Sequence, residues 1–547
     1  MKTFQPKLFS LFKNYSKNQF INDFIAGIIV AIIALPLSSA LAIASGVSPE
    51  KGLYTAIVAG FVIAFFGGSN VNISGPTAAF ATIVAGIVAQ YGTSGLVVAT
   101  IMAGIILIVM GLCKLGSLIK YIPYTITTGF TSGIALTIVI GQIKDFFGLT
   151  FPDGTHAVET PEKLHAIFSS VTTMNIQAVI VGLISLAVLI VWPKINKKIP
   201  GSLIAVIVGV VLVKALDMKV NTIGDLYTIS RTLPPFSLPD FDLATLKELV
   251  PSAFTIAILA GIESLLSCVV SDGMINDRHN SNTELISQGL GNICSGLFGG
   301  IPATGAIART AANVKNGGRT PVSGIVHALV LLVILVALMP YAAWIPMPVI
   351  AAILFMVAYN MSEWRQFVNI CKTAPKSDIA VLIITFVLTV VFDLVVAIEV
   401  GMVIAVLLFM KRMAEVTHIR TWTEADELSA TDGGRLKKIP EKTEVYEING
   451  PMFFATTDIF NSIPIKDGIE VMILRMRNVP SMDVSAVRVL RTIYEICKEN
   501  NISLIISHAN EQPVSVMKKS GFYDELGEEN FVSNIDEALL MAENIGN

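Results

Sequence analysis

With 547 residues, of which 53% are hydrophobic and only 14% charged, the chain is too apolar for an ordinary soluble protein. Its net charge of −3 argues against a nucleic-acid partner. Apolar residues come in runs of about 15 to 25 up to Arg412, and charged residues return beyond it. We therefore expect a cytosolic N-terminal segment at 1–20, a transmembrane domain at 21–412, a linker at 413–440 and a soluble domain at 441–547.

Fourteen membrane segments are predicted along the transmembrane domain. Their expected starts lie near Asp23, Gly52, Gly75, Thr93, Ile119, Met174, Pro200, Leu249, Glu284, Gly305, Thr320, Ile345, Asp378 and Asp393. Seven segments in each half place two related halves in opposite orientations, which is the inverted-repeat architecture of many secondary transporters. Lysine and arginine gather in alternate loops, and this pattern predicts a multi-pass protein of the cell membrane with both termini in the cytoplasm.

Two of the hydrophobic runs are interrupted by glycine, proline and threonine at matching places in the two halves. The first interruption runs from Ile73 to Phe80 and the second from Gly299 to Thr310. Backbone that breaks inside a bilayer is tolerated only where it faces protein or a wet cavity. A helix that starts there directs its N–H groups and positive dipole end into that cavity. Two such starts predict a binding site for a small anion.

After Thr443 apolar strands alternate with amphipathic helices, which predicts a small α/β sheet covered by helices. Strands are expected from Val445, at 470–476 and at 503–507, and helices near Thr456 and at 483–500, 513–520 and 534–542. This part resembles the STAS domain, above all from Asn478 to Ala486. The resemblance implies a phosphorylation site at Ser485, where a cytosolic regulator would act. Capping of the helix by Asp483 or Ser485 is the alternative interpretation.

The membrane part and the STAS tail together resemble the SulP family of anion permeases, whose animal members include prestin. The motifs that carry the resemblance are Ala34-Leu35-Pro36, Gly52-Leu53-Tyr54-Thr55, Ser74-Gly75-Pro76-Thr77, Asp277 to Leu285, Arg309-Thr310 and Gly317 to Pro321. The resemblance implies a UraA-like fold, in which a core of segments 1–4 and 8–11 moves against a gate of segments 5–7 and 12–14. It also implies a homodimer surrounded by membrane lipid.

Glu263 lies in the middle of the eighth segment, where an unpaired charged carboxylate costs about 2.5–3.5 kcal/mol on insertion scales. Burial favours the neutral acid, so the group is a candidate for proton exchange. In a sodium-coupled bicarbonate member of the family, the positions matching Glu263 and Ser267 help to bind Na⁺. That relative has a threonine where this chain has Ile307. The comparison favours H⁺ as the coupling ion and keeps Na⁺ as the alternative.

Arg309 lies about one turn into the tenth segment, where it can attract an anion. In prestin-like relatives the matching arginine belongs to the anion site, and an arginine that only balances Glu263 is the alternative. The other expected substrate contacts come from the first, third and tenth segments: Pro36, Leu37, Leu41, Gly75, Pro76, Thr77, Ala78, Gly305, Ala306, Ile307 and Ala308. Leu37 and Leu41 replace a glutamine and an aromatic residue of many relatives.

The leading hypothesis is a secondary active transporter of sulfate, bicarbonate or a dicarboxylate, with proton symport and an elevator-like motion. A Na⁺-coupled bicarbonate symporter is one alternative, and an uncoupled anion channel, exchanger or voltage-responsive motor is a second. A membrane-anchored signalling scaffold is a third, although it would not require broken helices. The cysteines show no metal-ligand spacing and no catalytic motif occurs, so we expect neither an enzyme nor a resident cofactor.

Overall fold

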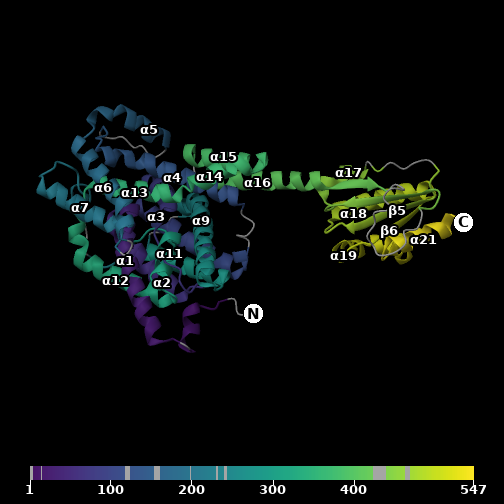
Figure 1. Ribbon diagram of the computed structural model, residues 1–547, viewed down its shortest axis with the longest axis horizontal. Coiled ribbons are helices and arrows are strands. Elements are labelled where there is room, and N and C mark those ends of the chain that lie inside the picture. Colours follow the sequence, from purple (N-terminus) through teal and green to yellow (C-terminus); the bar gives the residue numbers. More distant parts are fainter. Residues whose placement is uncertain are drawn as a thin grey trace. The chain divides into compact units, whose positions relative to one another are not determined.

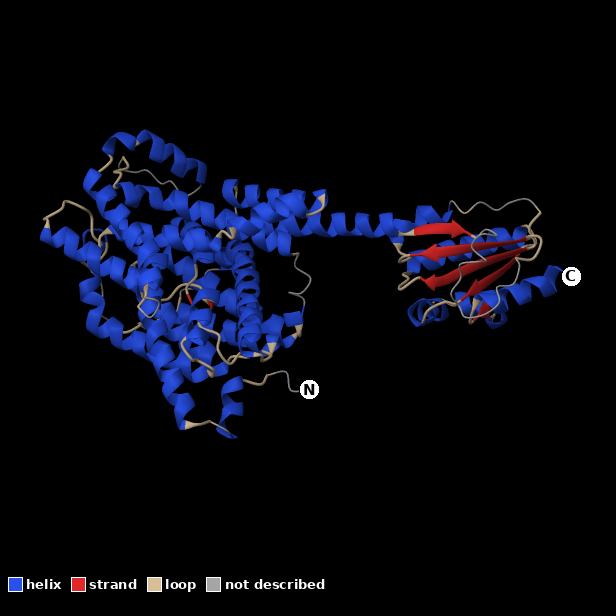
Figure 2. Ribbon diagram, viewed as in Figure 1, coloured by secondary structure: helices blue, strands red, loops and turns tan. Residues whose placement is uncertain are grey.

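The computed structural model describes residues 4–13, 15–117, 123–152, 160–196, 199–228, 232–239, 243–392, 394–422, 439–461, 463 and 468–546. Two expected segment starts, Ile119 and Asp393, and much of the expected linker lie outside these residues. The chain divides into two compact units, Met1–Met402 and Val403–Asn547, which are drawn in Figures 1 and 2. Each is described by itself.

The first unit is helical, as expected. Its long segments are α1 (Lys17–Ala44), α2 (Pro49–Phe66), η2 (Ala78–Phe80) with α3 (Ala81–Leu112), α4 (Tyr124–Phe147), α6 (Ile176–Ile195), α7 (Gly201–Ala215), α9 (Leu243–Ile275), α10 (Ser281–Leu297), α11 (Ile307–Lys315), α12 (Pro321–Ala342), α13 (Met347–Met361) and α15 (Lys376–Val391). Helix α16 (Leu394–Val416) begins in this unit and ends in the second. Shorter helices between or before them are η1 (Lys7–Lys13), α5 (Thr160–Ser169), η4 (Val171–Thr173), α8 (Ile223–Leu226) and α14 (Trp364–Thr373).

The described residues contain the fourteen segments in the predicted order, because α3 consists of two of them. Gly92 adopts φ 68° and ψ −170° inside α3 and bends it there. This backbone conformation is open to glycine and strained for other residues. The bend separates the expected third segment from the fourth, which was predicted to start near Thr93. Eight of the helices in the described residues are long and apolar enough to cross a membrane.

The first helix begins earlier than its apolar run, at Lys17 instead of near Asp23, because the Ser16 hydroxyl accepts a hydrogen bond from the third amide of the helix. Asp23 is fully buried and serves a different helix. Its carboxylate accepts hydrogen bonds from the amide of Arg319 at 2.8 Å and from the hydroxyl of Thr320 at 2.6 Å. A carboxylate at this place satisfies amides at the start of α12.

The helices of the first unit pack as two groups. In one group α10 lies against α3 and α2, α9 lies against α3 and α11, and α12 lies against α1 and α2. Gly104 of α3 and Gly289 of α10 face each other so closely that a Cβ on either would meet the other's carbonyl oxygen. Small residues at such a crossing allow the close helix contact that membrane proteins use. In the other group α4 packs against α13, α15 and α6.

The first group contains the segments that were expected to form the core, and the second contains four of the six segments that were expected to form the gate. A motion of one group against the other stays a prediction.

The second unit is a sheet with the strand order β3-β4-β5-β6-β7, shown in red in Figure 2. Its strands are β3 (His418–Thr421), β4 (Thr443–Asn449), β5 (Val471–Asn478), β6 (Ser503–Ser507) and β7 (Phe531–Val532), and its helices are η6 (Phe454–Thr456), α17 (Thr457–Asn461), α18 (Val484–Glu499), α19 (Glu511–Lys519), α20 (Phe522–Leu526), η7 (Glu528–Asn530) and α21 (Ile535–Gly546). All pairs are parallel except β3 with β4.

Alternate residues of the central strands enter two cores, one on each face of the sheet. Leu474 and Ile506 pack in the cluster that contains Leu490 of α18. Ile473 and Ile505 pack in the cluster of α21. This two-sided burial explains why these strands read as continuous apolar runs.

Strand β3 corrects the expected linker at 413–440. Residues His418–Thr421 pair with β4, and Trp422 packs into the core beside α21. Most of the β3 side chains are exposed, so the segment carries no apolar alternation that would reveal it. The soluble unit therefore starts before the expected boundary at 441.

Two truncations test whether the membrane unit stands alone. Deleting 441–547 leaves β3 without its partner strand, whereas deleting 417–547 removes β3 as well. We expect both proteins to keep the substrate profile of the full chain in proteoliposome uptake, since every expected substrate-site residue precedes Arg319. We also expect the first to aggregate more in size-exclusion chromatography, because an unpaired strand is a template for association. A changed substrate profile in both would contradict this independence.

Candidate functional site

The two interrupted segments meet in the middle of the first unit. Strand β1 (Ser74–Gly75) pairs antiparallel with β2 (Thr304–Gly305), and Ser74 lies opposite Gly305. The amide of Ala306 donates a hydrogen bond of 2.9 Å to the carbonyl of Ile73. Segments more than 200 residues apart in sequence thus satisfy each other's backbone at the point where both helices are broken, which is what a break inside a bilayer requires.

A helix begins directly after each of these strands. Thr77 caps η2 and Ala306 caps α11, and neither makes a side-chain capping hydrogen bond. Ile307 and Ala308, the first residues of α11, are exposed although they lie in the middle of the unit, with 43% of Ile307 accessible. Helix starts of this kind keep N–H groups and a positive dipole end available to a ligand.

Arg309 is the cation of the site. Its side chain is only 2% exposed, and its Nη2 donates a hydrogen bond to the carbonyl of Pro76. Its Nε and Nη1 have no hydrogen-bond partner among the described residues. Gly75 leaves the room for this guanidinium, since a Cβ built there would lie 2.6 Å from Nη1. A buried guanidinium with unused donors is strongly suited to an oxyanion.

Glu263 reaches the site from α9. Its Oε2 accepts a hydrogen bond of 2.9 Å from the hydroxyl of Thr77, and its side chain is partly exposed. Its carboxylate and the Arg309 guanidinium attract each other electrostatically, but no ion pair within 4 Å joins them in the described part of the chain. The alternative interpretation, in which Arg309 only balances Glu263, would require a direct ion pair, and the described residues contain none between these two side chains.

The paired strands β1 and β2 are called the crossing, because the two interrupted segments meet there. Ser267 belongs to a buried polar network beside this crossing. Its hydroxyl donates to Asn72 at 2.8 Å and lies 3.1 Å from the Thr310 hydroxyl. The Thr310 hydroxyl in turn accepts the amide of Ile73 at 3.0 Å. The contacts of Ser267 thus lead to the backbone of the crossing, one helical turn away from Glu263.

A buried carboxylate completes this network. Glu284 is fully buried and accepts hydrogen bonds from the amide of Gly68 at 2.9 Å and from the Asn72 side chain at 2.7 Å. Gln288 donates to Glu284 at 3.1 Å and to the Ser74 hydroxyl at 3.0 Å. Asn72 and Gln288 were not singled out from the sequence, and Glu284 was named only as the start of the ninth segment and as part of the motif Asp277 to Leu285. The available signal was the pair Glu284 and Gln288, polar residues one turn apart on a predicted membrane helix.

The other expected contacts lie around the crossing. Gly305 approaches Asn72 so closely that a Cβ would lie 2.6 Å from its Nδ2, which explains the glycine. On α1, Pro36 and Leu41 are buried and Leu37 is partly buried, and α1 packs beside α11. Ala78, in the first turn of η2, is buried. Substrate contact by these residues stays a prediction.

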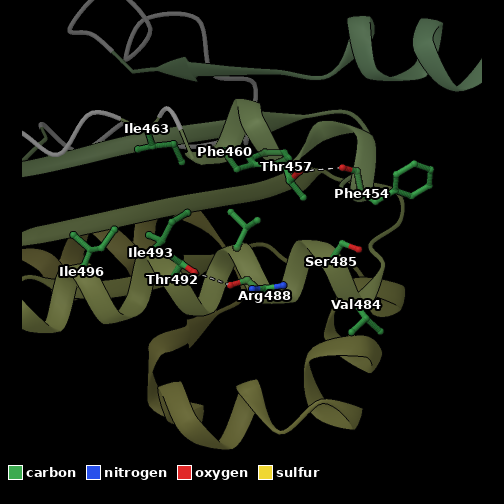
Figure 3. Close-up of a pocket in the computed structure, with 11 residues that line it drawn as sticks. Phe454, Thr457, Phe460, Ile463, Val484, Ser485, Arg488, Thr492, Ile493 and Ile496 are labelled. Atoms are coloured by element: carbon green, nitrogen blue, oxygen red, sulfur yellow. Dashed lines mark hydrogen bonds between the residues drawn. The ribbon is translucent and has the colours of Figure 1, made fainter.

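In the second unit, Ser485 is the second residue of α18. The capping group is Asp483, whose Oδ1 accepts the amide of Ala486 at 3.0 Å. Ser485 lines a groove of 860 Å³ between α17 and α18, together with Phe454 and Arg488 (Figure 3). Phosphorylation of Ser485 stays a prediction, and the open groove leaves its hydroxyl within reach of a partner.

Comparisons with known proteins agree on one kind of molecule. Residues 20–385 match the sulfate permease family and residues 436–538 match the STAS domain. The protein named "Putative sulfate transporter YvdB" from Bacillus subtilis is 41% identical over 96% of this chain and 98% of its own length. Bicarbonate transporter BicA from a Picosynechococcus species is 31% identical over 94% of both chains.

Several solved structures are similar to this chain. The transmembrane domain of a cyanobacterial BicA is 31% identical and matches with a TM-score of 0.63 over 72% of this chain and 98% of that one. The overall structure of SLC26A9 matches with a TM-score of 0.87 over 98% of this chain and 92% of that one. Its identity is 20%, so it shows the fold alone. The predicted UraA-like fold with a C-terminal STAS domain is confirmed.

The role of Arg309 is tested by Arg309→Ala. We expect binding of a small oxyanion to weaken by at least about tenfold, because a hydrogen bond to a charged group contributes roughly 1.5–3 kcal/mol. Isothermal titration of the purified protein measures this, and size-exclusion chromatography verifies folding. Arg278→Ala removes an exposed arginine outside the site and serves as the control. Unchanged affinity in a folded Arg309→Ala protein would make the residue structural.

The room left by Gly75 is tested by Gly75→Ala. The added methyl group collides with Nη1 of Arg309, so we expect weaker anion binding than in the wild type. In an Arg309→Ala background the same change should have little further effect, since the colliding atom is gone. Gly86→Ala is the control, because a Cβ there meets no atom within 4 Å. Additive effects of Gly75→Ala and Arg309→Ala would contradict this contact.

Proposed function

Because the chain belongs to the sulfate permease family, we propose that it is a secondary active transporter that moves a small oxyanion by proton symport. Its relatives are anion transporters and not enzymes, and the chain is an anion transporter of the same family. Sulfate, bicarbonate and dicarboxylates all present oxygen atoms to N–H donors. Each of them is a candidate substrate.

The observation that carries this function is the buried guanidinium between two uncapped helix starts. Nε and Nη1 of Arg309 are buried donors without a partner in the described residues. Leaving such donors unsatisfied is costly, and an oxyanion supplies the missing acceptors together with the missing negative charge. The N–H groups at the starts of η2 and α11 add donors from two further directions.

Proton coupling follows from the position of Glu263. When its carboxyl is ionised, it offsets the charge of Arg309 and accepts the hydrogen bond of the Thr77 hydroxyl. When it is protonated, the site has a net positive charge and the anion replaces the lost negative charge. Binding of a proton and of an anion therefore favour each other, as symport requires. A site loaded with both carries one negative charge fewer than a site loaded with the anion alone, which lowers the cost of moving the loaded site past the apolar gate.

A Na⁺-coupled bicarbonate symporter is the second candidate, because BicA is among the relatives. The described contacts favour it less. The Ser267 hydroxyl donates to Asn72 and lies against Thr310, and the exposed side chain of Ile307 offers hydrocarbon instead of an oxygen ligand. Sodium requires several oxygen ligands around one point.

We also propose where the protein lies in the cell and which partners it has. The alternation of lysine and arginine between loops supports a place in the cytoplasmic membrane with both termini inside. We also place the protein in a homodimer, as the resemblance implied. The groove beside Ser485 would receive a cytosolic regulator of the STAS domain.

Substrate and coupling ion are separated by uptake into proteoliposomes. A panel of labelled sulfate, bicarbonate, fumarate and succinate is offered with pH and Na⁺ gradients imposed separately. We expect one of these oxyanions to accumulate against its gradient when the outside is acidic, with no requirement for Na⁺. Strict dependence on Na⁺ at constant pH would favour the second candidate, and uptake that only equilibrates would favour an uncoupled channel.

The role of Glu263 is tested by Glu263→Gln, which resembles the protonated acid in shape and in its retained carbonyl oxygen. We expect the variant to bind anion and exchange it across the membrane while it loses accumulation driven by a pH gradient. Wild-type uptake should rise as the external pH falls, and uptake by the variant should be nearly independent of pH. Counterflow and net uptake in proteoliposomes measure the two activities.

Glu399→Gln is the matched control, because Glu399 is an exposed carboxylate of α16 outside the site. It should keep the pH response of the wild type. Retained pH-driven accumulation in Glu263→Gln would remove the proton assignment from this residue.

A further inference from the structure

A groove lies on the first unit where α4, α13, α14 and α15 meet. Its apolar part has a volume of 370 Å³, within the roughly 300–1,000 Å³ of small-molecule sites. The lining is mainly hydrocarbon and aromatic, and it includes Leu136, Phe355, Tyr359, Trp364, Val368 and Phe386. Leu136 and Val368 are 39% and 38% exposed, so the groove opens outward. In a bilayer, an opening of this kind among membrane-spanning helices faces acyl chains.

A polar pocket of 390 Å³ adjoins the apolar groove. The two share Tyr359 and Trp364, so they form one elongated site. One carboxylate, Glu363, and one guanidinium, Arg365, line the polar part, and the neutral side chains there are Tyr124, Asn360 and Gln366. The pocket thus offers one negative and one positive group next to an apolar groove.

The turn that carries these charges is fixed by α4. Glu363 adopts φ 44° and ψ 35°, a left-handed conformation that is uncommon outside glycine. Ser132 donates a hydrogen bond of 2.5 Å to the carbonyl of Ser362, and the Tyr124 hydroxyl donates to Glu363 Oε2 at 3.3 Å. These contacts hold the turn between α13 and α14 in this conformation.

We propose that this joined groove binds one phosphatidylethanolamine molecule of the membrane. The apolar part holds an acyl chain, and the polar part holds the zwitterionic headgroup. Glu363 accepts hydrogen bonds from the primary ammonium group, and Arg365, whose guanidinium lies 5.6 Å from the Trp364 ring, contacts the phosphate.

The charge pattern selects this headgroup over others. A purely anionic headgroup would meet the carboxylate of Glu363, which repels it. A choline headgroup balances the charges, but its quaternary nitrogen carries no N–H to donate. In the predicted orientation the site lies in the inner leaflet of the membrane. A lipid bound there would contact α4, α13, α14 and α15 together.

Native mass spectrometry of the purified full-length protein tests the proposal. The probes are phosphatidylethanolamine, phosphatidylcholine and phosphatidylglycerol with identical acyl chains, added in steps after delipidation. We expect the first lipid bound to be phosphatidylethanolamine, with an affinity at least about fivefold higher than that of either competitor, because only its headgroup offers the carboxylate a positively charged N–H donor. Glu363→Gln should bring the affinities for phosphatidylethanolamine and phosphatidylcholine together. Glu415→Gln, an exposed carboxylate at the end of α16, should not.

A second variant tests the apolar part. Val139→Phe fills the groove and should lower the affinity for all three lipids by a similar factor, whereas Val387→Phe on the exposed face of α15 should not. Equal affinity of the wild type for phosphatidylethanolamine and phosphatidylcholine would overturn the proposal, as would a preference for phosphatidylglycerol. Cross-linking of two chains through Val368→Cys with no lipid retained would show that a second copy occupies the groove instead.

Discussion

The site depends on the cost of a buried positive charge. Arg309 is 2% exposed and lies among the starts of two helices, whose dipole ends are themselves positive. Its hydrogen bond in the described residues goes to one carbonyl and the charge of Glu263 attracts it, which leaves two nitrogens without acceptors. A buried charge of this kind is tolerated when a counter-charge arrives. In the proposed function an anion substrate supplies that charge, and a proton on Glu263 increases the need for it.

The rest of the core keeps this unfavourable arrangement in place. Gly75 and Gly305 bring the two broken segments together, since a side chain on either would displace Arg309 or Asn72. Behind them, Asn72 and Glu284 form part of a fully buried network that ties the crossing to α9 and α10. Asn72 and Glu284 each make several hydrogen bonds, and this favours one geometry because each lost bond would leave a buried polar group unpaired. The crossing therefore keeps its geometry although two nitrogens of the Arg309 guanidinium have no hydrogen-bond acceptor.

Much of this architecture was predictable from the sequence, and the remainder depends on long-range contacts. Matching breaks in two apolar runs indicated the crossing, and the isolated ionisable residues Glu263 and Arg309 stood out against their surroundings. Asn72 and Gln288 did not, because their role follows from partners about 200 residues away. Strand β3 was missed for a different reason: its exposed side chains show no period, and its place in the sheet comes from pairing with β4.

The distribution of the site over the helices bears on how transport works. Thr77, Glu263 and Arg309 come from η2, α9 and α11, and these segments pack together with α1, α2, α3, α10 and α12. Close glycine contacts between α3 and α10 make this group stiff, since close-packed interfaces transmit displacement instead of absorbing it. The residues of the proposed anion and proton sites would therefore keep their mutual distances if the group moved. In the elevator-like cycle that we propose, the whole group would move past α4 and α13, and the site would face the other side of the membrane without being dismantled.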